Sequence, residues 1–313
     1  MNSETGTRKV VVLGINGHLG AAAARAFVAA GWDVTGFGRS ERQKVDGVRF
    51  VQGDADDTGS LRAAIAGQDV IVNALNLRYD QWFEGRAEAQ LARVLEAARG
   101  SGATLLFPGN IYNYAASAER ITPLTPEHPE TPRGEIRVRL EKMLEAATSD
   151  GGLRAVVLRA GDFYGPGASS DWFDQLILRE AKRGRVALAN HEIRHTWAYL
   201  PDLGRALVRL AEKRAELGPF ERFHFAGHFV TAGELFRAIE KQAGRKLKRV
   251  ATPWFLLKVM GWFNPVLREV VKMRYLFENP MALEDPKLEA LLGRGFDTPF
   301  EAAVGATVAP FFR

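Results

Sequence analysis

The chain has no cysteine among its 313 residues. This absence excludes disulfide bonds, thiolate nucleophiles and metal sites with cysteine ligands. Long apolar runs are also missing at the start, where polar residues precede one short apolar stretch, MNSETGTRKVVVLG. Such a start matches neither a secretory signal nor a membrane-spanning helix, so we expect a cytoplasmic protein without an integral membrane span.

The chain also lacks a strong excess of either charge. Its 42 Lys and Arg residues and 37 Asp and Glu residues give a net charge of +5, spread along the sequence. This modest balance does not indicate binding to nucleic acid. With 46% hydrophobic and 25% charged residues, the composition is typical of a globular protein, and the length allows two lobes.

The N-terminal region predicts a strand, a glycine-containing turn, a helix and a second strand. Residues 10–13 form a short β-branched run, typical of a strand buried on both faces. Gly17 and Gly20 flank the entry to an alanine-rich helix, which we expect to end near Gly31, where glycine can adopt a left-handed conformation. Glycines let the backbone approach an anion, and the helix N-terminus offers unpaired N–H groups. The turn is therefore a candidate phosphate site.

The glycine spacing, Gly14-x-x-Gly17-x-x-Gly20, differs from that of many dehydrogenases. It resembles the phosphate turn of the extended and atypical short-chain dehydrogenase/reductase superfamily, the NAD-dependent epimerase/dehydratase group. Three further segments resemble the same group: residues 51–75, 158–167 and 197–207. The resemblance implies an α/β fold of the Rossmann type, with a doubly wound parallel sheet, helices on both faces and a smaller C-terminal substrate lobe.

The same resemblance implies a division of the chain and a set of cofactor contacts. Residues 1–160 would form the NAD(P)-binding Rossmann domain, residues 196–212 would return to it, and residues 161–313 would form mainly the substrate-binding lobe. The implied cofactor contacts are Gly14, Asn16, Gly17, His18, Leu19 and Gly20 at the turn, Asp54 at the adenine with Ala55 beside it, and Ala74, Leu75 and Asn76 after the fourth strand.

The end of the second predicted strand bears on the choice between NAD and NADP. Arg39 and Ser40 stand where an NAD enzyme commonly places an acidic residue against the ribose hydroxyls. A guanidinium can bind a 2′-phosphate through two parallel hydrogen bonds, whereas a carboxylate repels it. We therefore expect NADP as the cofactor. NAD stays possible, and Arg39 would then be only an exposed charge.

Residues 132–147 predict a helix that carries unexpected arginines. Its apolar residues recur at intervals of three and four, while Arg133, Arg137 and Glu141 form a separate row. In the family, the corresponding helix carries a Tyr-x-x-x-Lys pair and a glutamate four residues after the lysine. If Glu141 is that glutamate, Arg137 replaces the lysine and Arg133 the tyrosine. Pro108 occupies the position of the family's serine or threonine, and no tyrosine of the chain precedes a lysine by four residues.

These replacements change the chemistry that the helix can perform. Arginine stays protonated at ordinary pH, so Arg133 cannot act as a general acid in the manner of tyrosine. Arg137 can still donate to a ribose hydroxyl or a cofactor phosphate. Two interpretations stay open. Arg137 and Glu141 form an ion pair on a solvated helix face, or the two arginines line the cleft and bind the cofactor or an anionic substrate.

Other residues are candidates for handling a proton. Tyr112 follows the fifth predicted strand at residues 103–107, and Asn110 could donate to a substrate carbonyl. Asp162 stands where the family usually has an asparagine that contacts substrate, and a carboxylate there could act as a base. Tyr164 lies in the same loop. The alternatives are a core role for Tyr112 and turn or capping roles for Asn110 and Asp162.

Three other patterns in the sequence bear on function: a zinc-helix spacing, a pair of serines and an apolar segment. In HEIRH, His191 and His195 have the spacing of a zinc helix, but other expected partners are missing, so we expect no metal. Ser169 and Ser170 lack the motif of a hydrolase nucleophile. Residues 254–263 are apolar but too short and interrupted to span a bilayer. They could cover the substrate cleft, form a subunit contact or lie on a membrane surface.

The sequence leaves two classes of function open. The first is an NAD(P)-dependent oxidoreductase or epimerase that acts on a carbonyl or hydroxyl carbon of a small substrate, for instance a nucleotide sugar. Its atypical catalytic set would be Tyr112, Asn110, Asp162 and Arg137. The second is a non-catalytic NADP-binding sensor or scaffold protein. Loss of the usual catalytic positions favours the second, whereas the cofactor framework and substrate loop favour the first, which we prefer. A homodimer is the expected assembly if the chain self-associates.

Overall fold

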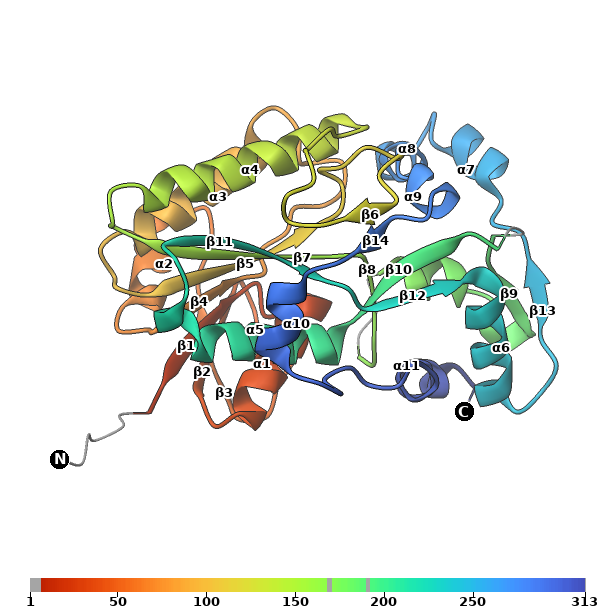
Figure 1. Ribbon diagram of the computed structural model, residues 1–313, viewed down its shortest axis with the longest axis horizontal. Coiled ribbons are helices and arrows are strands. Elements are labelled where there is room, and N and C mark those ends of the chain that lie inside the picture. The colour runs from red at the N-terminus through yellow and green to blue at the C-terminus, as the bar shows by residue number, and fades with distance from the viewer. Residues whose placement is uncertain (1–6, 168–170, 190–191, 313) are drawn as a thin grey trace.

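The computed structural model describes residues 7–167, 171–189 and 192–312. Its main feature is a seven-stranded parallel sheet with the order β11-β7-β5-β4-β1-β2-β3 (Figure 1). The strands are β1 (Lys9–Leu13), β2 (Asp33–Gly38), β3 (Val48–Gln52), β4 (Val70–Asn73), β5 (Thr104–Asn110), β7 (Arg154–Ala160) and β11 (Phe220–Phe225). The strand order changes direction between β1 and β4, as in doubly wound Rossmann folds. The predicted fold class is confirmed.

Helices cover both faces of this sheet, which explains why its central strands are apolar. Residues 10–13 of β1 are fully buried, as expected for a strand inside a parallel sheet. One face packs against α1 (His18–Ala29), α5 (Leu200–Glu212) and α10 (Pro286–Leu292), and the other against α2 (Thr58–Ile65), α3 (Arg86–Ala98) and α4 (Pro132–Thr148) (Figure 1). Helix α5 and strand β11 thus bring the chain back to the first sheet from beyond residue 161.

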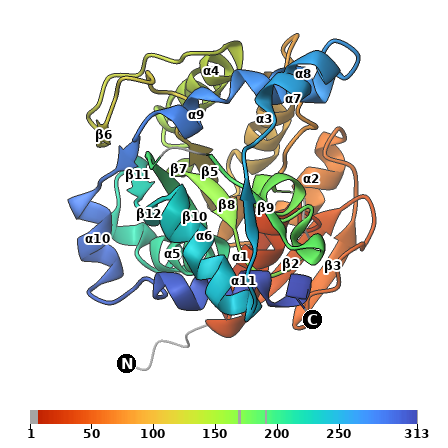
Figure 2. The same ribbon diagram turned by 90° about the vertical axis from the view of Figure 1, so that its right-hand side faces the viewer.

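A smaller part of the molecule follows the carboxyl end of β7. Its three-stranded sheet has the order β12-β10-β8, with β8 (Asp162–Tyr164), β10 (Arg194–Tyr199) and β12 (His228–Thr231). Two further strand pairs are β9 (Arg185–Ala187) with β13 (Lys248–Val250), and β6 (Arg120–Ile121) with β14 (Ala282–Leu283). The helical elements are α6 (Ala232–Ala243), α11 (Phe300–Phe312), η1 (Phe173–Ile177) and η2 (Ala181–Arg183), with η3 (Arg214–Glu216) following α5. Figure 2 shows α6, α11 and β9 on this side.

The apolar segment predicted at residues 254–263 forms α7 (Trp254–Met260) and the turn before α8 (Pro265–Lys272), which α9 (Tyr275–Glu278) follows. Trp254 lines a pocket. In contrast, Phe255 is 81% exposed and Phe263 is 86% exposed, so most of the segment does not cover that pocket. Among the helices that the structure describes, none combines the length and hydropathy needed to cross a bilayer.

Candidate functional site

The glycine turn between β1 and α1 has the close backbone approach that a phosphate site needs. Gly14 has a φ of +85°, and a Cβ atom there would lie 2.6 Å from the Ala74 carbonyl oxygen. A Cβ atom on Gly20 would collide with the Gly14 carbonyl oxygen. Gly17 caps α1 without a side-chain hydrogen bond. The first N–H groups of the helix lack intrahelical partners, so this cradle fits an anion such as a pyrophosphate.

Asn16 fixes the loop after β2 onto the glycine turn. Its side-chain N–H donates to the Ser40 carbonyl oxygen at 2.6 Å, and its side-chain oxygen accepts from the Arg42 N–H at 2.9 Å. Arg39, the neighbour of Ser40, is exposed and makes no ion pair within the described residues. A positive charge with no competing carboxylate therefore lies at the carboxyl end of β2.

His18 holds a second loop onto the same turn. The side chain is buried, its Nδ1 pairs with the Asp171 carboxylate, and its Nε2 lies 3.1 Å from the Pro166 carbonyl oxygen. Burial lowers the pKa of His18, but the hydrogen bond and charge of Asp171 outweigh it, so the pKa is raised. Both ring nitrogens face acceptors, which favours a protonated imidazolium at the start of α1.

The other predicted cofactor residues near the turn lie along the same edge of the sheet. Asp54 follows β3, and its exposed carboxylate accepts from the Asp56 N–H at 3.0 Å. Ala55 and Leu19 are partly buried and pack against the two core clusters that cover the faces of the sheet. Parallel pairing brings the carboxyl ends of β1, β2, β3 and β4 to one edge, which explains this placement.

A small pocket brings the segment after β4 together with α4. Leu75, Asn76, Trp82 and Arg137 are among its lining residues. The Arg137 guanidinium lies 4.4 Å from the Trp82 ring centroid, and its Nη1 donates to the Pro108 carbonyl oxygen at 3.4 Å. Its Nε has no partner among the described residues. Burial lowers the pKa of Arg137 to about 10, so the side chain stays charged at neutral pH.

Arg133, at the family's tyrosine position, is enclosed by aromatic rings from the loop after β4. Its guanidinium lies 3.8 Å from the Tyr79 ring centroid and 4.9 Å from that of Trp82. It also donates to the Tyr79 carbonyl oxygen. Burial lowers its pKa. Arg133 therefore holds this loop against α4 and does not project into solvent.

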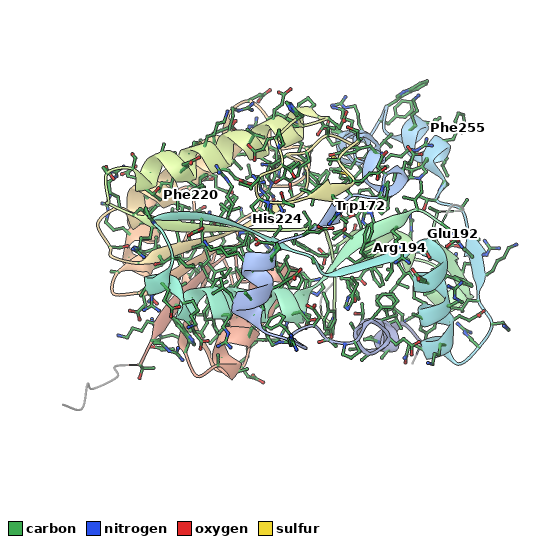
Figure 3. The ribbon with its side chains drawn as sticks, viewed as in Figure 1. Trp172, Glu192, Arg194, Phe220, His224 and Phe255 are labelled. Atoms are coloured by element: carbon green, nitrogen blue, oxygen red, sulfur yellow. The ribbon has the colours of Figure 1, made fainter. Side chains whose placement is uncertain are left out.

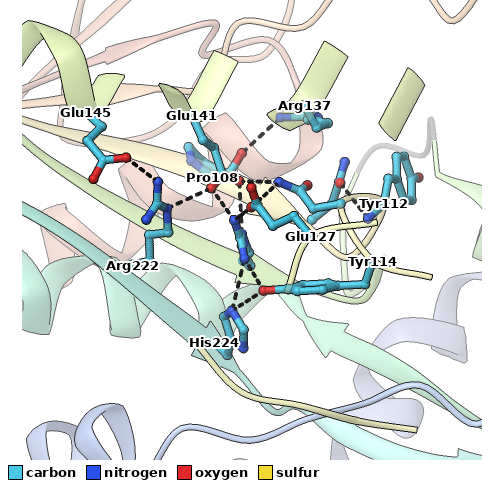
Figure 4. A network of polar contacts seen from close by, with 12 residues as sticks. Pro108, Tyr112, Tyr114, Glu127, Arg137, Glu141, Glu145, Arg222 and His224 are labelled. Atoms are coloured by element: carbon cyan, nitrogen blue, oxygen red, sulfur yellow. Dashed lines mark hydrogen bonds and ion pairs between the residues drawn. The ribbon is translucent and has the colours of Figure 1, made fainter. Parts of the chain in front are cut away.

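The interpretation of Arg137 and Glu141 as a solvated ion pair is wrong. Glu141 is fully buried, and it accepts hydrogen bonds from Nε of Arg159 at 3.0 Å and from Nδ2 of Asn113 at 3.2 Å (Figure 4). Nε of Arg222 lies 3.3 Å from its other oxygen. Helical spacing relates Glu141 to Arg137, but α4 packs over β7 and β11, which supply the two partner arginines.

Arg159 is the centre of this buried network. It also pairs with the Glu127 carboxylate and donates to the Tyr114 hydroxyl (Figure 4). Burial lowers the pKa of Arg159, but the charge of Glu141 outweighs it and the pKa is raised. Burial and the charge of Arg159 lower the pKa of His224 to about 4. The neutral His224 ring can thus accept from the Tyr114 hydroxyl at 3.0 Å, and the network joins α4, β7 and β11.

Tyr112 belongs to a pair of tyrosines. Its hydroxyl lies 3.1 Å from that of Tyr79. Burial raises the pKa of Tyr112 well above its ordinary value, and the nearby charges of Tyr79 and Asp162 raise it further. The Tyr112 phenol is therefore a neutral hydrogen-bond donor at physiological pH. Asn110 accepts from the Tyr112 N–H at 3.0 Å, which is a turn role for its side-chain oxygen.

Asp162 lies on strand β8 instead of in the predicted loop, and it pairs with His195 of β10. His195 Nε2 is 2.9 Å from Asp162 Oδ2, and Nδ1 is 2.9 Å from the Leu276 carbonyl oxygen. Because that carbonyl can only accept, Nδ1 is the donor there, and Nε2 faces the Asp162 carboxylate. Tyr164 is not part of this site, because its hydroxyl lies 2.6 Å from His228 Nδ1 in the core.

Sequence reasoning missed Tyr79, His195 and Tyr275. The Tyr275 hydroxyl is buried without a partner among the described residues, and the charge of Asp162 adds to burial in raising its pKa. Strand alternation could have indicated His195, but only once β8 and β10 are known to be neighbours. The alternation puts His195 on the same face of β10 as Trp197, and Trp197 is paired in register with Asp162.

The zinc-helix spacing and the serine pair fall mainly on residues that the structure does not describe. His191, Ser169 and Ser170 lie outside the described residues. Within the described ranges, no three His, Cys, Asp or Glu side chains gather in a way that could hold a metal ion.

Comparisons with known proteins agree with this fold. The sequence profile of the NAD dependent epimerase/dehydratase family matches residues 10–225. No curated protein sequence is found to match the chain. A UDP-glucose 4-epimerase from Brucella ovis in complex with NAD is 19% identical, with a TM-score of 0.75 and 98% of each chain covered. A UDP-N-acetylglucosamine 4-epimerase from Bacillus cereus is 16% identical, with a TM-score of 0.75, covering 97% of this chain and 99% of that one.

A third solved structure, the Bordetella bronchiseptica enzyme WbmH in complex with NAD+, is 18% identical, with a TM-score of 0.74 and 98% of each chain covered. At these identities the likeness shows the fold.

Proposed function

Because the chain belongs to the NAD dependent epimerase/dehydratase family, we propose that it is an NAD(P)-dependent oxidoreductase or epimerase acting on a carbonyl or hydroxyl carbon of a small substrate. The observation that carries this proposal is the glycine cradle, where Cβ atoms at Gly14 and Gly20 would collide with backbone. Such close backbone packing in the turn that enters a helix is typical of a dinucleotide pyrophosphate site. When bound, the nicotinamide would donate or accept the hydride.

Within this proposal, Arg39 selects NADP over NAD. It is exposed at the end of β2 and has no carboxylate partner among the described residues. A 2′-phosphate could therefore bind the Arg39 guanidinium without displacing an existing ion pair. Asn76 and Arg137 would contact the nicotinamide half, since they line one pocket after β4. The proposal also places the protein in the cytoplasm and, if the chain self-associates, in a homodimer.

In this proposal, the groups that exchange the proton are not at the α4 positions that carry the family's tyrosine and lysine. Arg133 and Arg137 cannot exchange a proton near neutral pH. Tyr112 can donate a hydrogen bond to a substrate oxygen, and the hydrogen-bonded Asp162–His195 pair would act as the general acid or base. Asn110 would position Tyr112 through the turn that it caps.

The second candidate is a non-catalytic NADP-binding protein. The specific observation in its favour is the enclosure of Arg133 and Arg137 by the Tyr79 and Trp82 rings, which gives both replaced positions a structural role. A sensor would bind the cofactor tightly and turn nothing over.

The test combines binding and turnover. We expect calorimetry to detect NADPH binding, and we expect NADPH oxidation in the presence of one member of a panel of aldehydes, ketones and nucleotide sugars. Tyr112→Phe should lower kcat by about 10²-fold and leave NADPH affinity unchanged. Tyr199→Phe is a matched control, because it removes a buried hydroxyl in the core of the smaller part. Tight binding without turnover would favour the sensor, and no binding of either dinucleotide would refute both.

A further inference from the structure

A separate pocket lies between the three-stranded sheet, η1 and α7, and its wall is almost entirely apolar. Four aromatic rings contribute to it, from Trp172, Trp197, Trp254 and Phe277. The ring centroids of Trp172 and Phe277 are 6.0 Å apart, and those of Trp254 and Phe277 are 5.9 Å apart. A concave space lined mainly by apolar and aromatic side chains is typical of a small-molecule site.

We infer that this pocket takes an uncharged, mainly apolar molecule that carries one carbonyl or hydroxyl group, and that it does not take a nucleotide sugar. This inference rests on the proposed function, because it names the class of substrate for the same enzyme. It is carried by the charge of the wall, by its single polar end and by its position next to the glycine turn.

The charge of the wall argues against a nucleoside diphosphate. Among the described residues, no lysine, arginine, aspartate or glutamate lines the pocket. Burying two phosphate charges without cationic partners is strongly unfavourable. Arg194 precedes His195 on β10, but strand alternation directs its side chain to the other face. There it donates to the Phe229 carbonyl oxygen at 2.8 Å and lies 3.5 Å from Glu234.

The polar groups of the wall suit one uncharged oxygen. Apart from indole N–H groups and backbone, they are His195 and Thr252. The His195 ring stacks on Phe277 with centroids 4.6 Å apart and planes 7° from parallel, so its apolar face belongs to the wall. Both ring nitrogens are already bonded, to Asp162 and to the Leu276 carbonyl oxygen, so the Thr252 hydroxyl is the polar end that the described wall offers to a ligand oxygen. A ketone or alcohol with an aromatic or alicyclic body matches this combination of one hydrogen-bonding end and apolar surroundings.

Trp172 joins the pocket to the other parts of the candidate site. Its indole lines the pocket. Burial raises the pKa of Tyr79, and a hydrogen bond between the Tyr79 side chain and that of Trp172 is a smaller, opposing effect. The preceding residue, Asp171, pairs with His18 at the first turn of α1. Figure 3 labels Trp172 near the boundary between the two parts of the molecule. The pocket therefore adjoins both the tyrosine pair and the proposed pyrophosphate site.

Binding of the uncharged, solvent-sensitive dye Nile red tests the inference. Because the exposed Phe255, Trp262 and Phe263 side chains could also bind a dye, the measurements use the F255S/W262S/F263S variant as the parent protein. Ala187→Trp fills the pocket from β9, and Ala63→Trp, on the exposed face of α2, is the matched control. NADPH binding is measured on each variant by calorimetry.

We expect saturable dye binding that A187W weakens by about tenfold or more, that A63W leaves unchanged, and that an uncharged aromatic ketone competes away. Millimolar UDP-glucose should not displace the dye. Displacement by UDP-glucose, or equal dye affinity in A187W and A63W, would overturn the inference even if NADPH binds. If the dye behaves as expected but neither dinucleotide binds, the proposed function fails and the pocket remains an apolar binding site.

Discussion

Removing one charge from the buried network behind α4 should destabilise the protein strongly. In Glu141→Gln, the fully buried carboxylate loses its charge while the side chain keeps its size. Arg159, whose side chain is 1% exposed, would keep Glu127, but the Glu127 side chain is 24% exposed and cannot replace a buried partner fully. Breaking a buried ion pair by removal of one partner costs about 3 to 5 kcal/mol. Since glutamine still accepts one hydrogen bond, we expect about 3 kcal/mol.

Chemical denaturation of wild type, E141Q and a control variant measures this loss. The control is Glu301→Gln, which breaks an exposed pair with Lys241 whose side chains are 65% and 61% exposed. An exposed pair of this kind contributes less than about 1 kcal/mol. The double variant E141Q/R159M should lose less than the sum of the two single variants, because it removes the unpaired charge itself. A loss below about 1 kcal/mol for E141Q, similar to that of E301Q, would refute the reasoning.

Three further predictions concern the glycine turn and its surroundings. Arg39→Glu should weaken NADPH binding in calorimetry by about tenfold or more, since a charged hydrogen bond contributes about 1.5 to 3 kcal/mol, and should leave NADH binding intact; unchanged NADPH affinity would contradict the NADP assignment. Because the pKa of His18 is raised in the folded protein, the stabilisation from its pair with Asp171 is fully present below the unfolded value near 6.5 and lost as pH rises through the folded value. Unfolding free energies of wild type and Asp171→Asn should therefore converge with rising pH, and a gap independent of pH would show that the pair does not titrate. Gly14→Ala should cost about 1 to 3 kcal/mol of stability and abolish dinucleotide binding, because the residue has a φ of +85° and its Cβ would lie 2.6 Å from the Ala74 carbonyl oxygen; NADPH affinity equal to wild type would contradict the cradle.

The central sheet could be predicted because its signals are local. A buried parallel strand is a short β-branched run, and a glycine near a helix end marks the left-handed residue, as Gly31 does with a φ of +76°. These features depend on residues within one or two turns of each other.

The polar contacts could not be predicted because they join distant segments. Glu141 and Arg159 are 18 residues apart, and Asp162 and His195 are 33 apart. Spacing within a helix identifies neighbours on its surface, but it does not show which face a neighbouring strand covers. For that reason the sequence leaves a solvated pair of Glu141 with Arg137 open as one of two interpretations, and it presents His195 only as a metal ligand of its own segment.

Arg133 and Arg137 stand at the positions of the family's tyrosine and lysine, and both contact aromatic rings of the loop after β4. The guanidinium of arginine is planar and stacks on aromatic faces. The two guanidiniums accordingly bind the Tyr79 and Trp82 rings, at 3.8 Å and 4.4 Å from their centroids. This contact holds Tyr79 where its hydroxyl lies 3.1 Å from that of Tyr112. The arginine at the family's tyrosine position therefore stabilises a tyrosine pair opposite α4. The pair places a neutral phenol donor beside the loop that the family's relay would face, while proton exchange in our proposal falls to the Asp162–His195 pair.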